Sequence, residues 1–401
     1  MSHRVRLLAF LLLPCLAAAC RSKPKPEVSK DYARPLPEGM MALEKIDPSQ
    51  YPDFGRGFTG DPEGLLASID YSLTYFSKPS SKKPYPYLDV SHDRAQRSLV
   101  EFRALLQTAK SPEELNREVA ARFDVYRSVG YDGNGTVLYT GYCEPIYEGS
   151  RTPTPIYKYP IYRLPPDLVK QPDGTCLGRK TPQGLVPYHT RREIDTIKAL
   201  AGKQLEICWL PDKLQVYICH VQGSARIKLV DGNELRLGYA GKNEHPYTSL
   251  GGLLVKDGRV PKDRMSLTAI KDYFAQHPEE LDYYMYQNPS YVFFQENQGG
   301  PYGCLGVTVT PYHSFATDKK VFPPGCVGFF DTELPVWTSL DTIGFQPQAR
   351  FALDQDRGGA IRSAGRCDIF LGTGPPAERL AGYMQREGRL YYIFSKEGAA
   401  P

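Results

Sequence analysis

The sequence lacks the patterns that mark most metal, cofactor and nucleic-acid sites. No C-x-x-C pair occurs, and the seven histidines are never grouped at metal-ligand spacing, which argues against a zinc site. A glycine-rich candidate for a dinucleotide loop, Gly372-Thr373-Gly374, runs directly into Pro375-Pro376. The formal net charge is only +4 over 401 residues, without a dense Lys/Arg stripe. We therefore expect no metal, no cofactor and no nucleic-acid partner.

The pattern of a nucleophilic serine site is also missing. No Ser/His/Asp order is evident, and the segment 222–226, Gln-Gly-Ser-Ala-Arg, lacks the second glycine of a nucleophile elbow. The sequence is instead rich in Gly (36), Pro (35) and Tyr (28), with 41% apolar and 23% charged residues. This composition is typical of a globular protein with many short strands and turns. The length allows about two domains.

The N-terminus combines Arg4 and Arg6 with a short apolar run and three alanines before Cys20. This order predicts a secretory signal peptide, residues 1–19, which is too short to span a membrane. A cysteine directly after small residues resembles the bacterial lipoprotein box, so Cys20 is the predicted lipidation site. The alternative is an ordinary signal peptidase site followed by an incidental cysteine. Arg21, in place of Asp, indicates outer-membrane sorting among Gram-negative lipoproteins.

The rest of the chain divides by its patterns. Residues 20–45 are interpreted as the lipid anchor and a proline-rich tether. Helix start signals occur at Asp61-Pro62-Glu63, Ser91, Ser111-Pro112-Glu113-Glu114, Thr190-Arg191-Arg192-Glu193 (for a helix through Leu200) and Ser266, and one more helix is expected near 377–384. Strands are expected at 135–142, 215–220, and 224–230 with 234–239, which the turn Asp231-Gly232-Asn233 joins into a hairpin.

The distribution of strands predicts two domains. Strand-rich segments at both ends, 46–142 and 297–396, are expected to form one discontinuous barrel domain, and residues 143–296 a second β domain inserted into it. A cleft between two such domains is a favoured binding site. The cysteines beyond the leader are Cys143, Cys176, Cys208, Cys219, Cys304, Cys326 and Cys367. Their odd number leaves at least one thiol, and Cys208 with Cys219 is the candidate disulfide.

Two aspartates near the C-terminus lie around a glycine pair in strand-like sequence. Asp356 precedes Gly358-Gly359, and Asp368 is followed at once by Ile-Phe-Leu. Acids are depleted from strands and costly to bury. A carboxyl held among apolar neighbours has a raised pKa, as a general acid near neutral pH requires. Taken alone, however, an Asp in a glycine-rich segment is more often a turn or cap residue.

The order of motifs along the chain adds to this interpretation. In chain order they are Thr140–Pro145, Tyr159–Tyr162, Pro165–Leu168, Arg192–Asp195, Val221–Ser224, Gly238–Asn243, Asn288–Phe294, Ala316–Asp318, Pro323–Gly325 and the segments around Asp356 and Asp368. This succession resembles the membrane-bound lytic murein transglycosylase A family over about residues 135–395. Over residues 21–130 only the length and the helical character are similar.

The resemblance implies a double-psi β-barrel with a second β domain inserted and a glycan groove between them. It implies cleavage of the β-1,4 bond between N-acetylmuramic acid and N-acetylglucosamine without water, leaving a 1,6-anhydromuramoyl end. The three aspartates for which the family's C-terminal domain is named correspond to Asp318, Asp356 and Asp368, and its catalytic acid/base to Asp368. The implied location is the periplasmic face of the outer membrane, with peptidoglycan strands as substrate and cell-wall synthesis or division proteins as candidate partners.

A single carboxyl suits this chemistry. Hydrolytic glycosidases usually need two acids, whereas here the C6 hydroxyl of the substrate itself attacks and no water needs activation. Asp368 would protonate the bridging oxygen and then, as a carboxylate, accept the C6 hydroxyl proton. Asp356 either tunes Asp368 or is a structural acid that bonds backbone N–H groups. Asp318, beside a Pro-Pro-Gly turn, is a weaker candidate for which a structural role is favoured.

Further residues are candidates for binding the glycan. Thr140 and Tyr142 line the expected groove, or else pack inside the barrel. On the inserted domain the candidates are Gln222, Ser224, Tyr239 and Asn243, among which the amides of Gln222 and Asn243 are preferred because they both donate and accept.

Departures from the family pattern are Arg357, Cys143 and Cys367, none of which removes a carboxylate. Two alternatives stay open. One is a non-catalytic peptidoglycan-binding or scaffolding lipoprotein. The other is a hydrolase, for which only Glu144 offers a second carboxylate.

Overall fold

The computed structural model describes residues 30–59, 62–171, 175–340 and 342–397. The predicted signal peptide and the predicted lipidation site Cys20 lie outside these residues, as does the first part of the tether. Across the described ranges, none of the helices is both long and apolar enough to cross a bilayer.

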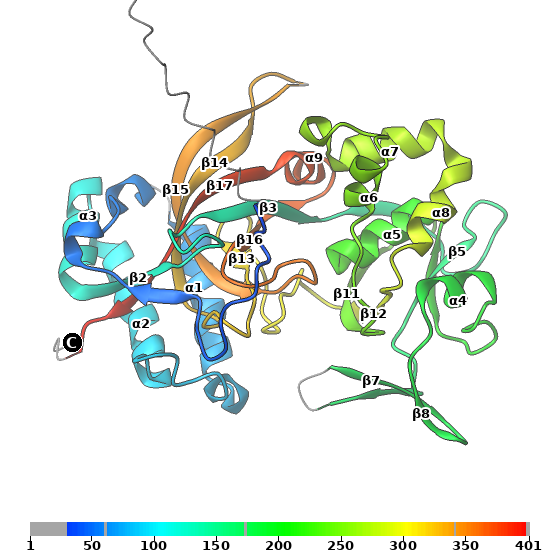
Figure 1. The fold of residues 1–401 in the computed structure, drawn as a ribbon, viewed down its shortest axis with the longest axis horizontal. Helices are drawn as coiled ribbons and strands as arrows, with labels where there is room; N and C mark the ends of the chain where they lie inside the picture. Colours follow the sequence, from blue (N-terminus) through cyan, green and yellow to red (C-terminus); the bar gives the residue numbers. More distant parts are fainter. Residues whose placement is uncertain (1–29, 60–61, 172–174, 341, 398–401) are drawn as a thin grey trace, which may run out of the picture. The chain divides into compact units, whose positions relative to one another are not determined.

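Six strands close into a β-barrel (Figure 1). In order around the barrel they are β17 (Gln385–Ser395), β14 (Val327–Trp337), β15 (Ile343–Asp356), β13 (Ser314–Ala316), β16 (Arg366–Thr373) and β3 (Val137–Glu144). The ring closes because β17 pairs with β14 and, through residues 385–388, also with β3. Closure removes the unpaired edges that an open sheet would expose. The predicted fold class, mainly β with a barrel and an inserted domain, is confirmed.

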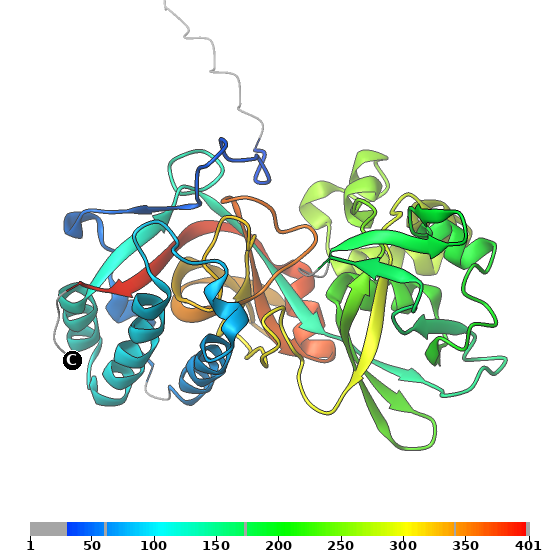
Figure 2. The same cartoon turned by 90° about the horizontal axis from the view of Figure 1, so that it is seen from below.

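The N-terminal segment packs on the outside of the barrel. Strands β1 (Leu43–Lys45) and β2 (Phe123–Ser128) extend the sheet beyond β17. Helices α1 (Glu63–Phe76), α2 (His92–Thr108) and α3 (Pro112–Arg122) share one apolar core with the barrel strands, against which they lie in Figure 2. The helix starts predicted at Ser91 and Ser111 are confirmed, since Ser91 caps α2, and Ser111 caps α3 with Pro112 in its first turn. Helix α1 begins at Glu63 as predicted, while Asp61 of its predicted start lies outside the described residues.

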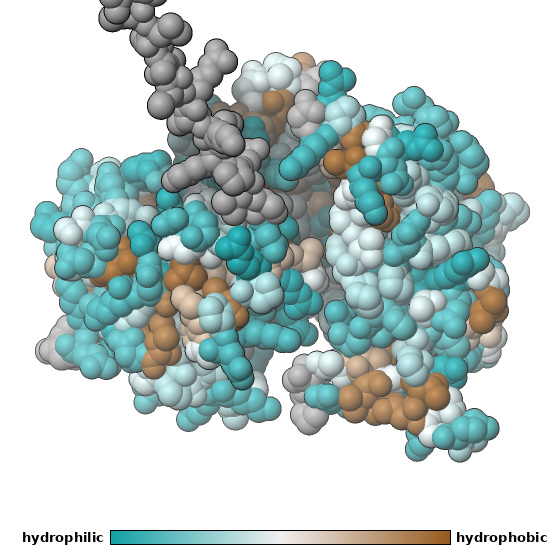
Figure 3. Space-filling model, in the orientation of Figure 1, coloured by the Kyte–Doolittle hydropathy of each residue, from teal (hydrophilic) through white to brown (hydrophobic). Residues whose placement is uncertain are grey.

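The residues between β3 and β13 form sheets of their own. The largest has the order β12 (Val292–Asn297), β11 (Glu234–Lys242), β10 (Ser224–Leu229) and β4 (Ile146–Gly149). Strand β5 (Tyr159–Tyr162) pairs with β9 (Glu206–Leu210), while β6 (Leu168–Lys170), β7 (Cys176–Thr181) and β8 (Gly184–Val186) form a third sheet. Figure 3 shows an apolar patch over β7 and β8, whose Leu177 and Leu185 are exposed. The predicted hairpin is confirmed by the antiparallel pairing of β10 with β11.

Helices complete the inserted region and the barrel. Those of the insert are α4 (Arg191–Thr196), α5 (Lys213–Gln222), α6 (Leu250–Lys256), α7 (Leu267–Gln276) and α8 (Leu281–Tyr286), and α9 (Pro375–Tyr383) belongs to the barrel. Short 3-10 turns lie at Pro48–Gln50, Phe54–Gly57, Pro79–Lys82, Lys262–Arg264 and Pro278–Glu280. Helices α5 to α8 and the largest sheet of the insert bury an apolar core separate from that of the barrel.

Some local predictions for the insert were wrong. Residues 215–220, predicted as a strand, lie inside helix α5. Asp212 caps this helix by accepting the Leu214 N–H at 2.7 Å, and Gly223 ends it with a φ of 76°. These end signals outweigh the β-propensity of the apolar residues between them. The helix capped by Thr190 stops at Thr196 and does not reach Leu200, because Lys198 adopts a φ of 55°.

The candidate disulfide was also wrong. Cys208 lies on β9 and Cys219 on α5, and both are buried free thiols, as are Cys143, Cys176, Cys326 and Cys367, while Cys304 is free and exposed. The prediction assumed a strand between the two cysteines, whereas the helix there sets the two side chains on different elements.

Strand β3 joins the barrel to the insert. It pairs with β16 and β17 inside the barrel and leads after Pro145 directly to β4. At this junction the Cys143 N–H donates to Oε1 of Gln222 on α5 at 3.0 Å. Glu144, only 1% exposed, accepts from Arg226 on β10 and from Thr373 on β16, each at 3.0 Å. Side chains as well as the chain itself therefore hold the insert against the barrel.

Candidate active site

The register of the barrel places two of the predicted aspartates in one row. Ala316 on β13 pairs with Asp356 on β15 and with Asp368 on β16, and Asp368 pairs in turn with Thr140 on β3. Residues paired across neighbouring strands point to the same face of a sheet. With strands about 4.8 Å apart, the backbones of Asp356 and Asp368 are separated by about 10 Å. The small side chain of Ala316 lies between the two acids.

Asp368 has the environment of a general acid. Burial raises its pKa from 3.8 to about 6, and the charge of Asp356 adds to the rise. Two groups act in the opposite direction: the Thr140 hydroxyl, which donates to Oδ1 at 2.8 Å, and the positive charge of Arg366. A carboxyl with a pKa near 6 can hold a proton in weakly acidic solution and also give it up, as an acid that later serves as a base must do.

Asp356 is held mainly by the backbone. Its Oδ1 accepts the N–H groups of Cys304 at 2.9 Å and of Arg357 at 2.8 Å. Burial raises the pKa of Asp356, and these N–H groups and the nearby Tyr142 hydroxyl oppose the rise. The Tyr142 hydroxyl itself is buried and has no well-formed hydrogen bond to any described residue. Asp356 thus accepts two backbone donors on one oxygen, whereas Asp368 accepts a single side-chain donor.

Arg366 lies two residues before Asp368 on β16, so both side chains belong to one face of the strand. Its Nη2 donates to the Thr140 hydroxyl at 3.3 Å, which gives a chain of bonds from Arg366 through Thr140 to Asp368. The sequence interpretation missed Arg366 and Ala316. The alternation of side chains along a strand would have indicated Arg366, whereas the role of Ala316 depends on long-range pairing that no local pattern reveals.

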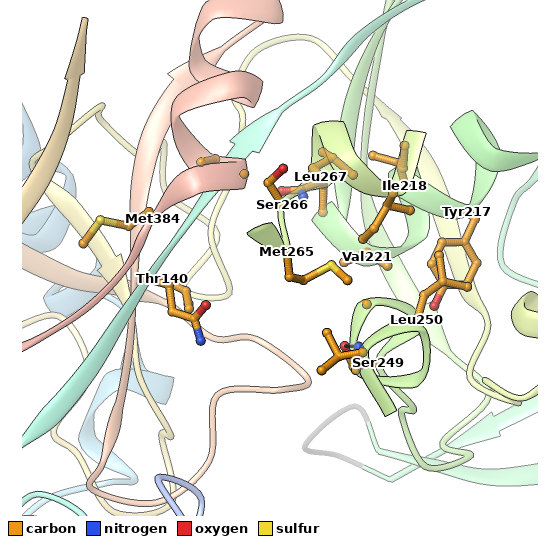
Figure 4. Close-up of a pocket in the computed structure, with 18 of the residues that line it drawn as sticks. Thr140, Tyr217, Ile218, Val221, Ser249, Leu250, Met265, Ser266, Leu267 and Met384 are labelled. Atoms are coloured by element: carbon orange, nitrogen blue, oxygen red, sulfur yellow. Dashed lines mark hydrogen bonds between the residues drawn. The ribbon is translucent and has the colours of Figure 1, made fainter. Parts of the chain in front are cut away.

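A cavity of about 440 Å³ opens beside Thr140 (Figure 4). Thr140 and Met384 lie on its barrel side, and Val221, Met265 and Leu250 of the insert face them. Gln222 also lines this cavity, so two of the predicted glycan-binding residues, Thr140 and Gln222, lie at the same cavity. Apolar side chains predominate, with polar groups at Ser249, Ser266, Lys262 and Gln385.

Tyr239 lies near the barrel loop that carries Arg357. Its side chain is on β11 and is 40% exposed. Burial of the hydroxyl raises the pKa of Tyr239 to about 12, and the Arg357 charge is the first group that opposes this rise. Tyr239 thus offers a partly exposed aromatic ring from the insert, a kind of side chain that can pack against a sugar ring.

Two predicted binding residues have their polar side-chain groups bonded inside the protein. Asn243, 4% exposed, donates from Nδ2 to the carbonyls of His189 and Pro289 and accepts the Tyr291 N–H. Asp318 accepts the N–H groups of Lys320 at 3.1 Å and Ser363 at 2.9 Å.

Ser224 is 8% exposed and pairs with Gly238 in the hairpin of β10 and β11. For Asn243, Asp318 and Ser224, these positions favour structural roles over contact with a ligand.

The departures noted in the sequence lie close to the site without blocking it. Cys367 and Cys143 are fully buried, and Cys367 pairs with Tyr139, on the opposite face of the sheet from Asp368. The remaining acid considered for hydrolysis, Glu144, is committed to Arg226 and Thr373. Among the described residues, no group of His, Cys, Asp and Glu side chains is arranged to hold a metal ion.

Comparisons with known proteins agree with this architecture. The family model "MltA specific insert domain" matches residues 138–295, and the model "3D domain" matches residues 313–394. Membrane-bound lytic murein transglycosylase A of Escherichia coli K12 is 33% identical over 279 residues, which is 69% of this chain and 70% of that protein. The protein of the same description from Vibrio cholerae is 33% identical over 267 residues, 66% of this chain and 67% of its own length.

Solved structures give the same result. A membrane-bound lytic murein transglycosylase from Agrobacterium tumefaciens superposes with a TM-score of 0.72 at 29% identity, covering 88% of this chain and 98% of its own. The structure of E. coli MltA with bound chitohexaose superposes with a TM-score of 0.65 at 25% identity, covering 93% of this chain and 99% of its own.

Proposed function

The chain belongs to the membrane-bound lytic murein transglycosylase A family, and on that premise we propose that it is a lytic transglycosylase of peptidoglycan. It cleaves the β-1,4 bond between N-acetylmuramic acid and N-acetylglucosamine and leaves a 1,6-anhydromuramoyl end. The observation that carries the proposal is Asp368, an acid with a pKa of about 6 whose side-chain donor, Thr140, lines a cavity. The chitohexaose bound to E. coli MltA is a β-linked amino-sugar chain of the kind this groove would accept.

The proposed mechanism uses Asp368 twice. In its protonated form it donates to the glycosidic oxygen, and the bond from C1 of the muramic acid to that oxygen breaks. The C6 hydroxyl of the same sugar then attacks C1, and the Asp368 carboxylate accepts the hydroxyl proton, which restores the acid. No water enters, so atoms and protons balance within the substrate. The attacking hydroxyl is already part of the bound sugar, and this proximity replaces the second carboxylate of a hydrolase.

Other residues support this step in the proposal. The Thr140 hydroxyl orients Asp368 and stabilises its carboxylate form, and Asp356 contributes charge from the opposite side of Ala316. Thr140, Tyr142, Gln222 and Tyr239 are the proposed groove residues, while Ser224, Asn243 and Asp318 support it from within. The buried ion pair of Glu144 with Arg226 leaves no second acid for hydrolysis at that position.

We further propose the domain boundaries and the location. The barrel domain comprises 46–142 and 297–396, with the insert at 143–296. The protein is lipid-anchored at Cys20 on the periplasmic face of the outer membrane, where peptidoglycan strands are its substrate. Labelling with a radioactive fatty acid, followed by cell fractionation, tests both the lipid and the membrane. A Cys20→Ala variant that still takes up label, or wild-type protein recovered free of the outer membrane, would contradict this location.

Digestion of purified sacculi tests the activity. Products analysed by mass should carry anhydromuramoyl ends with wild-type protein and none with Asp368→Asn. Reducing ends would contradict the mechanism, and an active Asp368→Asn variant would contradict the residue. Binding of sacculi without any cleavage by wild type would favour the non-catalytic alternative.

A further inference from the structure

Arg366 is a partly buried cation without an ion-pair partner in the described part of the chain. Some guanidinium groups of the structure meet carboxylates, as Arg226 meets Glu144 and Arg94 meets Asp124, whereas the buried Arg191 is bonded to the carbonyls of Asn288 and Ser290. Among the described residues, no Asp or Glu lies within ion-pair distance of Arg366, although Asp368 lies two residues away on the same strand and Thr140 separates them. Its charge is therefore available to a group from outside the chain.

One N–H of the same guanidinium is unsatisfied. The Nε of Arg366 is buried and has no hydrogen-bond partner in the described part of the chain, while Nη2 is the atom that donates to Thr140. Buried polar groups are nearly always bonded, and an exception needs an explanation such as a bound water or ion. A charged donor makes this exception more costly than a neutral one.

The position of Arg366 connects it to the cavity. Thr140, which accepts its hydrogen bond, lines the cavity from the barrel, and Tyr247 lines it from the insert. Burial raises the pKa of the Tyr247 hydroxyl, and the Arg366 charge is among the groups that oppose this rise. Through its bond to Thr140, the Arg366 guanidinium is thus one residue removed both from the cavity and from Asp368.

We propose that Arg366 is a carboxylate-recognising residue of the groove, which binds an acidic group of the muramic acid side of the substrate. The planar guanidinium presents paired donors that match the two oxygens of a carboxylate. N-acetylglucosamine has no charge, whereas a muramic acid unit carries a lactyl carboxylate, or a peptide stem with carboxylates of its own. The inference rests on the proposed function for the identity of the glycan, but its chemistry is the binding of a carboxylate.

Binding measurements separate this role from catalysis. The protein carries Asp368→Asn, which keeps an oxygen for Thr140 and leaves the glycan intact. Calorimetry compares the binding of three kinds of glycan strand. The first has no peptides and carries free lactyl carboxylates, the second is the same strand with these carboxylates converted to methylamides, and the third keeps its peptide stems. We expect the free lactyl strands to bind about tenfold more tightly than the methylamides, and Arg366→Gln to abolish this difference.

Control variants fix the interpretation. Arg366→Lys should keep part of the preference because it keeps the charge. Arg103→Gln, which removes the same charge from an exposed pair with Asp70 on the outer helices, should leave it unchanged. If Arg366→Gln loses affinity only for the strands with free lactyl groups, Arg366 binds the lactyl carboxylate. If it loses affinity for the strands with peptide stems, Arg366 binds a carboxylate of the stem.

Two results would overturn the proposal. One is an equal loss of affinity for the methylamide strands, which would make Arg366 a positioning residue for Thr140 only. The other is a protein with Arg366 intact that shows no preference for charged strands, a result that does not depend on the folding of any Arg366 variant. If the wild-type protein forms no anhydromuramoyl ends, the proposed function is refuted. The preference for charged glycan strands is measured by binding and is tested independently of that result.

Discussion

The hydroxyl of Thr140 donates to Oδ1 of Asp368 at 2.8 Å, across the parallel pairing of β3 with β16. The acid and its donor come from strands 228 residues apart in sequence. Burial favours the neutral form of Asp368, and this hydrogen bond favours the charged form. The balance between them leaves the acid with a pKa of about 6, and several measurable consequences depend on that balance.

The pH dependence of cleavage should report Asp368. Because the first step needs a protonated acid with a pKa of about 6, kcat/KM should fall about tenfold per pH unit above that value. Thr140→Val removes the donor that stabilises the carboxylate, so the descending limb should move to higher pH, while Thr140→Ser should leave it in place. The measurement is a pH series with soluble glycan strands. A limb that stays fixed in Thr140→Val would show that Thr140 does not act on Asp368.

Asp368→Asn should make the folded protein more stable at neutral pH. The pKa of Asp368 is raised on folding from 3.8 to about 6, so its contribution to stability is fully present below pH 4 and is lost as pH rises through 6. The neutral amide of the variant does not ionise, so its free energy of unfolding should exceed that of wild type by about 2–3 kcal/mol at pH 7.5. Urea unfolding at pH 4 and pH 7.5 measures it. A gain that is equal at both pH values would contradict the electrostatic origin.

Asn243→Ala should destabilise the insert without a specific loss of glycan affinity. The substitution leaves the carbonyl of His189 and the N–H of Tyr291 without their buried partner, while the Pro289 carbonyl keeps the Arg191 N–H. Unsatisfied groups of this kind cost about 1–3 kcal/mol in total stability. Urea unfolding and glycan binding below the transition test the two parts separately. If the variant is as stable as wild type but binds glycan weakly, Asn243 contacts the glycan directly.

Glu144→Ala should be the most destabilising of these changes. Glu144 is 1% exposed, and its removal leaves the Thr373 hydroxyl without its acceptor and the Arg226 charge with only the more distant Glu234, at 3.7 Å. Breaking a buried pair from one side costs about 3–5 kcal/mol. Glu296→Ala is the matched control, because its pair with Arg151 has both side chains 43% exposed and should contribute below about 1 kcal/mol. Similar losses for both variants would show that burial of Glu144 contributes nothing.

Local signals in the sequence were sufficient for helix starts and turns. Ser91, Ser111 and Thr190 cap helices where predicted, since a cap needs only the few residues after it. Helix α5 was missed because its apolar residues are also good strand formers, and the decisive signals, Asp212 and Gly223, lie at its two ends.

The site itself was only partly predictable. The motif around Asp368 indicated an acid among apolar neighbours, and the structure gives that acid a raised pKa. The row through Ala316 depends on strand register between distant segments, which no local pattern encodes. Asn243 was chosen for its donors and acceptors, but the loops of His189 and Pro289 use its donors first.

Strand β3 determines how freely the groove can open. It is part of the barrel through β16 and β17, and its last residues hold the insert through Gln222 and Arg226. Hinge motions need a few residues that can change φ and ψ freely, and the residues of this connection are bound in sheet pairing and buried hydrogen bonds. Movement of the insert would therefore also disturb the strand that carries Thr140, the donor to Asp368, so the position of the insert is coupled to the geometry around the acid.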